Sequence, residues 1–371
     1  MQLIDVIVIG GGIAGVGAAA ELAERGARVV LLEREAQLAQ HTTGRSAAQY
    51  LENYGGPLNR ALTLASREGF ARGPFLTNRP MLHVGTAAEQ DELASLAAEG
   101  ARLVPSIRLI DGGECCRIVP VLRPEVVEAG VLEPDAADID VAALHQSFVQ
   151  RARAAGAEVR THAGEVQVRR DGDRRWRADA PGLAAPLSAA VVVNAAGAWG
   201  DVVAAGAGVA PLGLTPLRRT AFLVPAPAGS ERWPLVVWGA RCYFKPEAGP
   251  SLLCSPVDET PSAPCDARPE ELDVARALDA LDRCTTLGAR HVRTAWAGLR
   301  TFAPDRHPVI GFDPDAAGFF WLVGQGGTGI QTAPAQAAAT AALALGDPLP
   351  AALTAAGVTA EALSPARLRT R

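Results

Sequence analysis

Three glycines near the start of the sequence have the spacing found in loops that bind a phosphate. Gly10, Gly12 and Gly15 form a GxGxxG motif between an apolar run at residues 3–9 and a helical pattern at 14–25. The first glycine permits a tight turn, the second lets backbone approach a pyrophosphate, and the third lets helix and strand pack closely. The N–H groups and the dipole of the helix start favour phosphate charge, so the motif predicts a dinucleotide site.

A carboxylate stands where the ribose of a dinucleotide would need one. Glu33 follows a predicted strand at residues 27–32 and lies 18 residues after Gly15. It can accept a hydrogen bond from a ribose hydroxyl, and it would repel the 2′-phosphate of NADP. The motif therefore favours NAD or FAD, against the alternative of a glycine-rich turn without a ligand.

Two further segments of small residues favour FAD over NAD. Residues 191–199 (VVVNAAGAW) suit a strand that runs into a tight turn, and residues 324–331 (GQGGTGIQ) open the last predicted helix. Reduction makes the N1–C2=O edge of a flavin anionic, and N–H donors at a helix start can stabilise that charge.

The apolar pattern around these motifs predicts an α/β protein. Strands are expected at residues 3–9, 27–32, 79–84, 126–132, 157–161, 165–170, 175–180, 187–193, 214–224, 235–238, 242–245, 252–255, 291–302 and 319–323, with a hairpin turn at 171–173. Helices are expected at residues 14–25, 57–70, 87–99, 140–155, 270–281 and 333–345. Buried strands that alternate with helices suit a parallel sheet, whereas strands with proline-rich connections suit a mixed or antiparallel one.

A length of 371 residues suits two domains. We expect a Rossmann-like FAD-binding domain, a parallel sheet with helices, built from residues 1–50, 138–205 and 296–371. Residues 51–137 and 206–295 are expected to form a discontinuous α+β substrate-binding domain with a mixed or antiparallel sheet.

Composition and charge exclude several classes of protein. The net charge of −5 disfavours nucleic acid and anionic membranes, because both favour a surplus of Lys and Arg. The six cysteines contain no CxxC pair, which suits a reducing compartment, and no metal site is expected. We interpret Cys115 and Cys116 as small packed residues, with a redox-active pair as the alternative. No apolar segment is long enough to span a bilayer, so we expect a cytoplasmic protein, with attachment to the inner membrane surface as the alternative.

Four motifs in this order carry a family resemblance: TTGRSAA at residues 42–48, VVVNAAGAW at 191–199, TAWAGLR at 294–300 and GQGGTGIQ at 324–331. From residue 3 to about residue 367, the chain resembles the D-amino-acid oxidase/glycine oxidase superfamily of FAD enzymes. Within it, the chain is most similar to the bacterial FAD-dependent D-arginine dehydrogenases. The resemblance implies a non-covalent FAD, because no cysteine stands near Gly298, where related sarcosine oxidases tether the flavin.

The glycine motif and the resemblance together assign the cofactor contacts. They are Gly10, Gly12, Ile13, Ala14, Gly15, Glu33, Arg34, Thr42, Thr43, Gly44, Arg45, Ser46, Ala47, Ala48, Val166, Ala195, Gly197, Trp199, Gly298, Gly326, Gly327, Thr328, Gly329, Ile330 and Gln331.

The resemblance also implies oxidation of an amine next to a carboxylate, by hydride transfer from Cα to flavin N5. The imino acid product would hydrolyse to a 2-oxo acid and ammonia. Arg219 and Arg300 match the family's carboxylate clamp, and Tyr54 and Tyr243 match two tyrosines that add hydroxyl contacts. The planar fork of arginine binds a carboxylate bidentately, so these residues would act by positioning the substrate. Without the resemblance, an arginine on a strand is usually a surface residue.

Two positions depart from the arginine-type enzymes. Met81 stands where they have a Glu that pairs the substrate guanidinium, and Gln49 stands where they have a His. A cation unpaired against Met81 would be penalised by desolvation. We therefore expect a D-amino acid with a neutral, apolar side chain, although Met81 suits a plain core position equally well. The expected substrate pocket consists of Gln49, Met81, Leu235, Val237 and Gly327.

Several alternatives stay open. The nearest is an oxidase or demethylase of secondary amines, of the sarcosine or glycine oxidase kind. More distant ones are a flavin-carrying subunit without its own chemistry and an NAD-dependent dehydrogenase. The electron acceptor could be a quinone, an electron-transfer protein or oxygen. Residues 54–57 (YGGP) suit either the hinge of a lid or a rigid turn.

Overall fold

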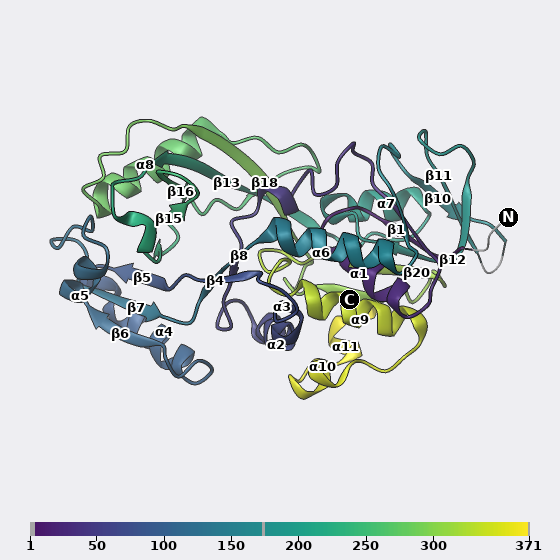
Figure 1. Ribbon diagram of the computed structural model, residues 1–371, viewed down its shortest axis with the longest axis horizontal. Coiled ribbons are helices and arrows are strands. Elements are labelled where there is room, and N and C mark those ends of the chain that lie inside the picture. The colour runs from purple at the N-terminus through teal and green to yellow at the C-terminus, as the bar shows by residue number, and fades with distance from the viewer. Residues whose placement is uncertain (1–3, 173–174, 370–371) are drawn as a thin grey trace.

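The computed structural model describes residues 4–172 and 175–369. Two large sheets lie toward opposite ends of its long axis, and a three-stranded sheet lies between them (Figure 1). Leu3 of the first predicted strand and Asp173 of the predicted hairpin turn lie outside the described residues. The fold is mixed α/β, as the apolar pattern predicts.

The first large sheet has eight strands and carries the glycine motif. Its strands are β1 (Ile4–Ile9), β2 (Val29–Leu32), β9 (Glu158–Arg160), β10 (Gln167–Arg170), β11 (Trp176–Asp179), β12 (Leu187–Asn194), β19 (Val309–Phe312) and β20 (Phe319–Val323). Strands β9, β2, β1, β12 and β20 are parallel, with β9 at one edge, and β10, β11 and β19 pair in the antiparallel sense. Parallel strands buried on both faces read as continuous apolar runs, which explains why the sequence revealed them.

Three helices cover one face of this sheet: α1 (Ile13–Glu24), α6 (Val141–Ala154) and α9 (Ala333–Leu345). Helix α1 packs between the other two. A Cβ on Gly17 of α1 would lie 3.1 Å from the Cβ of Ala337 in α9. Small residues thus let these two helices approach closely.

The second large sheet has nine strands. They are β5 (Met81–Gly85), β6 (Arg108–Asp111), β7 (Ala129–Glu133), β13 (Thr215–Pro225), β14 (Leu235–Trp238), β15 (Cys242–Glu247), β16 (Ser251–Ser255), β17 (Thr260–Pro261) and β18 (Thr294–Phe302). All pairs are antiparallel except β5 with β14. The border expected at residue 296 falls inside β18, which belongs to this sheet.

The two faces of the nine-stranded sheet differ because successive side chains of a strand point to opposite sides. Phe222, Val236 and Phe244 face a buried core completed by α8 (Glu271–Cys284) and α5 (Gly112–Ile118). Tyr243 is one residue from Phe244 and Arg219 is three residues from Phe222, so both face the other side. Arg218 points to the α8 side, as its position next to Arg219 predicts, and pairs with Asp273.

The remaining elements connect these layers. They are β3 (Gln49–Tyr50), β4 (Leu76–Asn78), β8 (Ala137–Ile139), α2 (Pro57–Ala65), α3 (Arg67–Phe70), α4 (Gln90–Ala101), α7 (Gly200–Gly206), α10 (Ala351–Ala355) and α11 (Ala360–Leu363). Strands β3 and β4 both pair with β8 in the three-stranded sheet.

Some predictions about elements were wrong. The helix expected at 57–70 is interrupted at Ser66, whose hydroxyl donates to Leu62 O and accepts from Ala335 N of α9. The strand expected from residue 291 begins at Thr294. Helices α5 and α7 and strand β19 were not expected, because each is short and lacks a periodic apolar pattern.

Cys115 is buried in α5, and burial raises the pKa of its thiol to about 12, which favours packing over redox chemistry.

Among residues 4–172 and 175–369, no helix combines the length and the apolar character needed to cross a bilayer.

Candidate functional site

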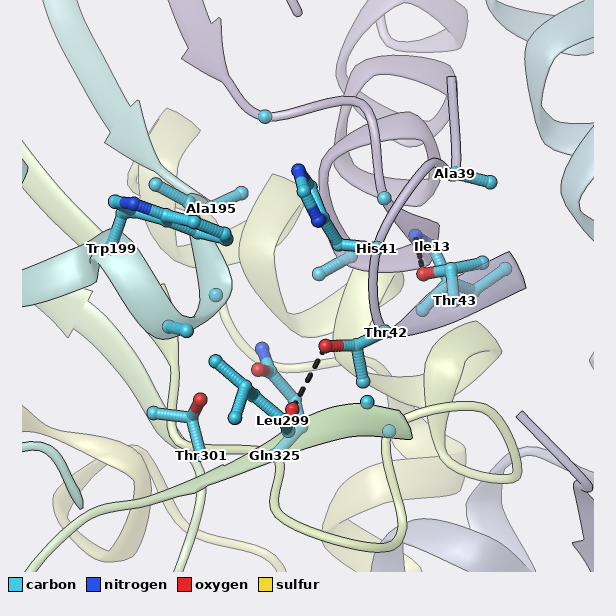
Figure 2. A pocket seen from close by; sticks show the side chains of 18 of the residues that line it. Ile13, Ala39, His41, Thr42, Thr43, Ala195, Trp199, Leu299, Thr301 and Gln325 are labelled. Carbon is cyan, nitrogen blue, oxygen red and sulfur yellow. Dashed lines mark hydrogen bonds between the residues drawn. The ribbon is translucent and has the colours of Figure 1, made fainter. Parts of the chain in front are cut away.

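A cavity of about 550 Å³ runs between the two large sheets. Segments that lie far apart in the sequence line it. They are the glycine turn after β1, the loop that follows β2, the turn after β12, strands β13 and β18, and the turn before α9. Figure 2 shows Ile13 and Thr43 on one side of this cavity and Trp199 and Ala195 on the other. Loops at the carboxyl ends of parallel strands are the usual ligand site of such sheets.

The glycine turn leaves no room for side chains. Gly10 has a φ of +107°, and a Cβ there would lie 2.5 Å from Ala195 O. A Cβ on Gly15 would lie 1.9 Å from Gly10 O. Gly12 is the N-cap residue of α1, so the first N–H groups of the helix face the cavity end of the turn. The backbone itself therefore forms this wall.

Side chains hold the surrounding loop against the turn. Glu33 accepts hydrogen bonds from Gly11 N at 2.6 Å and from Glu35 N at 2.8 Å. Thr43 Oγ1 accepts from Ile13 N at 3.0 Å, and Thr42 Oγ1 donates to Leu299 O of β18 at 2.8 Å (Figure 2). The loop thereby bridges α1 and the nine-stranded sheet.

Trp199 contacts a cation and a second ring where the cavity wall meets the turn after β12. The guanidinium carbon of Arg34 lies 4.5 Å from the centroid of the Trp199 ring, and the His41 ring lies 4.8 Å from the Trp199 ring. Arg45 also lines the cavity, but its guanidinium donates to Ala267 O and Ala297 O at 2.9 Å each. Arg45 therefore ties two segments together instead of offering a free cation.

The structure brings most of the expected cofactor residues to this cavity. Lining it are Gly10, Gly12, Ile13, Ala14, Glu33, Arg34, Thr42, Thr43, Arg45, Ser46, Ala47, Ala48, Val166, Ala195, Gly197, Trp199, Gly298, Gly326, Gly327, Gly329, Ile330 and Gln331. Gly15, Gly44 and Thr328 stand behind the lining, where Gly44 packs on Ala39 O and Thr328 donates to Asn59. Sequence reasoning missed Thr301 and Gln325, which flank expected residues.

Four expected substrate residues converge at the end of the cavity that faces the nine-stranded sheet. Arg219, Arg300 and Tyr243 line it. A Cβ built on Gly327 would lie 3.1 Å from Arg300 Nη1 and 3.5 Å from the Tyr54 hydroxyl, so these two side chains meet above Gly327. Within the described part of the chain, the Arg300 guanidinium and the Tyr54 and Tyr243 hydroxyls have no hydrogen-bond or ion-pair partner.

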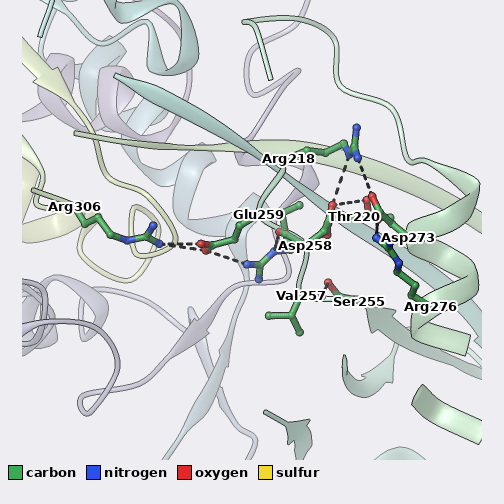
Figure 3. Close-up of polar contacts among 10 residues, drawn as sticks. Arg218, Thr220, Ser255, Val257, Asp258, Glu259, Asp273, Arg276 and Arg306 are labelled. Carbon is green, nitrogen blue, oxygen red and sulfur yellow. Dashed lines mark hydrogen bonds and ion pairs between the residues drawn. The ribbon is translucent and has the colours of Figure 1, made fainter. Parts of the chain in front are cut away.

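Arg219 is held by a segment that follows β16, residues 257–259, which we call the strap. Val257 has a φ of +59°, an uncommon conformation for a β-branched residue. It turns the chain so that Asp258 O accepts from Arg219 Nε at 2.8 Å, while the Asp258 carboxylate accepts from Thr220 N at 2.7 Å. Glu259 Oε1 lies 3.3 Å from Arg219 Nη2 and also pairs with Arg306 (Figure 3). Burial and nearby Arg300 lower the pKa of Arg219, so an anion between the two arginines would be stabilised.

Replacement of Glu259 by Gln tests the role of the strap. The Glu259 carboxylate competes with any bound anion for Arg219, and a neutral amide competes less. We expect KM for an anionic substrate to fall about two- to fivefold with kcat unchanged, because a partly exposed ion pair contributes little. Steady-state kinetics would measure this change.

Glu270→Gln is the matched control, because Glu270 pairs with Arg218 on the opposite face of β13. Its KM should equal that of the unchanged chain. A clear rise in KM for Glu259→Gln would contradict competition and indicate that Glu259 positions Arg219.

The expected apolar residues form a cluster beside the clamp. Met81 and Leu235 are buried together with Leu51, and Val237 and Tyr243 pack against them. None of the three aliphatic side chains expected in the substrate pocket (Met81, Leu235 and Val237) lines the cavity itself. They stand next to it, in contact with Tyr243, which does.

Gln49 lies between the cavity and a partly buried ionic cluster. Its Nε2 donates to Asp138 at 3.2 Å, and Asp138 also binds Arg79 at 2.9 Å and Lys245 at 2.7 Å. These cations hold the pKa of the Asp138 carboxyl below its usual value despite burial. Lys245 is the only lysine of the sequence, and it is 6% exposed.

Comparisons with known proteins identify the family. The family model described as FAD dependent oxidoreductase (DAO) matches residues 5–343. The chain belongs to the DAO family of FAD-dependent oxidoreductases. This oxidoreductase is 29% identical over 334 residues to glycerol-3-phosphate dehydrogenase 1 of Mycobacterium bovis. The alignment covers 80% of the chain and 62% of that relative. It is also 30% identical to the tRNA 5-methylaminomethyl-2-thiouridine biosynthesis bifunctional protein MnmC of Burkholderia thailandensis. This alignment has 416 residues and covers 99% of the chain and 60% of that relative.

The oxidoreductase thus spans about three fifths of the length of these curated relatives. Among solved structures, glycine oxidase from Geobacillus kaustophilus superposes with a TM-score of 0.81 at 22% identity, covering 94% of the chain and 96% of that structure. This likeness shows the fold, a Rossmann-like FAD-binding sheet with a second sheet beside it. The particular similarity to D-arginine dehydrogenases that the motifs suggested is not among these findings.

Proposed function

We propose that FAD binds non-covalently along the cavity. The glycine turn and Glu33 would hold the ADP half, and Gly298 with residues 326–331 would hold the flavin ring. The missing space for side chains at Gly10 and Gly15 supports the first part, because these glycines allow the tight turn and the close packing of α1 on β1 that a dinucleotide site needs. None of the described cysteines lines the cavity, which agrees with a cofactor that is not tethered. The volume lies within the range of about 300–1,000 Å³ usual for cofactor sites.

We further propose that the enzyme oxidises the α-amine of a D-amino acid whose side chain is neutral and apolar. The observation that carries this proposal is the group of unpartnered donors around Gly327. A half-buried guanidinium and two hydroxyls that have no partner in the described chain are free to bind a ligand, and a substrate carboxylate would engage all three. The D configuration comes from the family resemblance.

The residues would act by placing the substrate. Bound FAD supplies the acceptor for the hydride that leaves Cα. Arg219 and Arg300 hold the carboxylate in a fixed plane, and Tyr54 and Tyr243 donate to its oxygens. The strap keeps Arg219 in that orientation before the substrate arrives, which lowers the entropy lost on binding. The imino acid that leaves would be hydrolysed by water to a 2-oxo acid and ammonia.

Anaerobic bleaching of the enzyme-bound flavin tests this proposal. The panel contains D-leucine, D-methionine, D-arginine, the matching L-amino acids, N-methyl amino acids and glycerol 3-phosphate. We expect D-leucine and D-methionine to bleach the flavin fastest, because the apolar cluster of Met81, Leu235 and Val237 packs against Tyr243 beside the clamp and offers no charged partner. Much the highest efficiency with D-arginine would contradict an apolar preference, and bleaching by none of the amino acids would contradict the function itself.

Oxidation of a secondary amine is the second candidate. The similarity to the MnmC relative favours it, because the printed name of that protein includes a methylaminomethyl group, a secondary amine, and the same carboxylate clamp would serve it. Faster bleaching by N-methyl amino acids than by D-leucine would support this candidate. Oxygen consumption in the same assays would show whether the enzyme acts as an oxidase or needs another electron acceptor.

A further inference from the structure

A segment between β17 and α8 reaches the cofactor cavity, and we call residues 262–268 the flap. Pro264 of the flap lines the cavity. Ala267, three residues further on, is 7% exposed and belongs to an apolar cluster with Ala198 and Trp199 of the turn after β12. The flap therefore packs against the part of the cavity wall that this turn forms.

Arg45, in the loop that follows β2, fastens the flap to a second part of the wall. Its Nη1 donates to Ala267 O of the flap and to Ala297 O of β18 at 2.9 Å each, and its Nη2 forms an ion pair with Asp266 of the flap. His41 Nδ1, in the same loop, lies 4.0 Å from the Asp266 carboxylate. The flap thus joins the loop after β2 to the turn after β12, and the cavity lies between these two segments.

Few backbone hydrogen bonds hold the flap in place. Ser262 N, at its first residue, donates to Pro216 O at 3.0 Å. Of residues 263–268, none donates a backbone hydrogen bond to another residue of the described chain. A segment with so few backbone hydrogen bonds can open locally at a low cost in free energy. The contacts of Arg45 and the packing of Ala267 are therefore what keeps the flap closed.

Arg45 lines the cavity, but its guanidinium already has a carboxylate and two carbonyl oxygens as partners. We propose that Arg45 and Asp266 form the latch of a flap that closes over bound FAD, and that this latch sets how fast the cofactor leaves and enters. The Asp266 side chain is 61% exposed, so water competes for the pair and the latch can open. This inference rests on the proposed placement of FAD and does not depend on the substrate.

The variant Asp266→Asn separates a latch from direct binding of the cofactor by Arg45, because the two predict opposite signs. Loss of the latch charge should make FAD leave the holoenzyme about two- to fivefold faster, as suits a partly exposed ion pair. If Arg45 bound the pyrophosphate directly, removal of the competing carboxylate would slow the release. The measurement is exchange of bound FAD for an excess of 8-chloro-FAD, followed by the absorbance of the protein-bound flavin. Unchanged or slower exchange would overturn the inference.

The variant Arg45→Met provides the second measurement. It removes the ion pair and both hydrogen bonds to carbonyl oxygens, and it keeps an apolar stem at this position. Exchange of FAD should become at least about tenfold faster. Rebinding of FAD to the apoprotein should also become faster, because an open flap clears the entrance, so Kd should change less than the rate of release. Faster release with unchanged or slower rebinding would indicate a lost direct contact and would contradict the latch.

Arg268→Met is the matched control, because Arg268 is an exposed arginine of the same flap. Its exchange of FAD should stay within about twofold of that of the unchanged holoenzyme. Equal acceleration by Arg268→Met and Arg45→Met would mean that the latch has no special role. None of these measurements uses a substrate, so an enzyme that oxidises no amino acid would overturn the proposed reaction and leave the latch standing. Failure of the unchanged chain to bind FAD would overturn both.

Discussion

Gly15→Ala should purify largely without FAD. The new Cβ would lie 1.9 Å from Gly10 O, a backbone atom that cannot move without opening the turn. Opening it withdraws the N–H groups that face the cavity. We expect affinity for FAD to fall at least about 100-fold, which corresponds to about 2.7 kcal/mol. The ratio of flavin to protein absorbance and titration of the apoprotein with FAD would measure the loss.

Gly17→Ala is the matched control within the same helix. There the new Cβ would meet the Cβ of Ala337 at 3.1 Å, a side-chain contact that α1 and α9 can adjust. This variant should lose about 1–3 kcal/mol of stability through overpacking and retain its FAD. Full flavin content in Gly15→Ala would mean that the turn does not bind the pyrophosphate.

Arg300→Ala should nearly abolish oxidation of amino acids. Removing one partner of a desolvated charge pair costs about 2–5 kcal/mol, so kcat/KM should fall by about 30- to 5,000-fold. Arg300→Lys keeps the charge but loses the planar fork, and it should recover part of this loss. Stopped-flow reduction under anaerobic conditions would separate weaker binding from slower reduction.

Arg218→Lys controls for loss of an arginine on the same sheet. Arg218 faces α8 and pairs with Asp273 at 2.8 Å, so its change should lower the melting temperature and leave flavin reduction within about threefold. An Arg300→Ala enzyme that still oxidises D-leucine at the original efficiency would remove the clamp from the mechanism.

The eight-stranded sheet was largely visible in the sequence because its features are local. Residues 319–323 and 333–345 have the predicted bounds. An apolar run and an alanine-rich helix can each be recognised from a few neighbouring residues. The interruption at Ser66 was not visible, because it depends on a hydrogen bond from Ala335, 269 positions away.

In the candidate site too, local motifs were predicted from the sequence and long-range contacts were not. The glycine motif and the residues that flank it were predicted because one turn contains them. The strap on Arg219 was not, since Asp258 reaches Arg219 only through the pairing of β13 with β16 and β17.

The ion pair of Lys245 with Asp138 has a consequence for chemical work on this enzyme. Because the one lysine is buried, the surface of the protein carries no side-chain primary amine, and its fixed positive charges are guanidinium groups. Amine-directed cross-linkers, acylating labels and lysine acetylation would find no accessible side chain. Exposed Cys265, next to the cavity-lining Pro264, offers a thiol instead, so a probe attached there would sit beside the site.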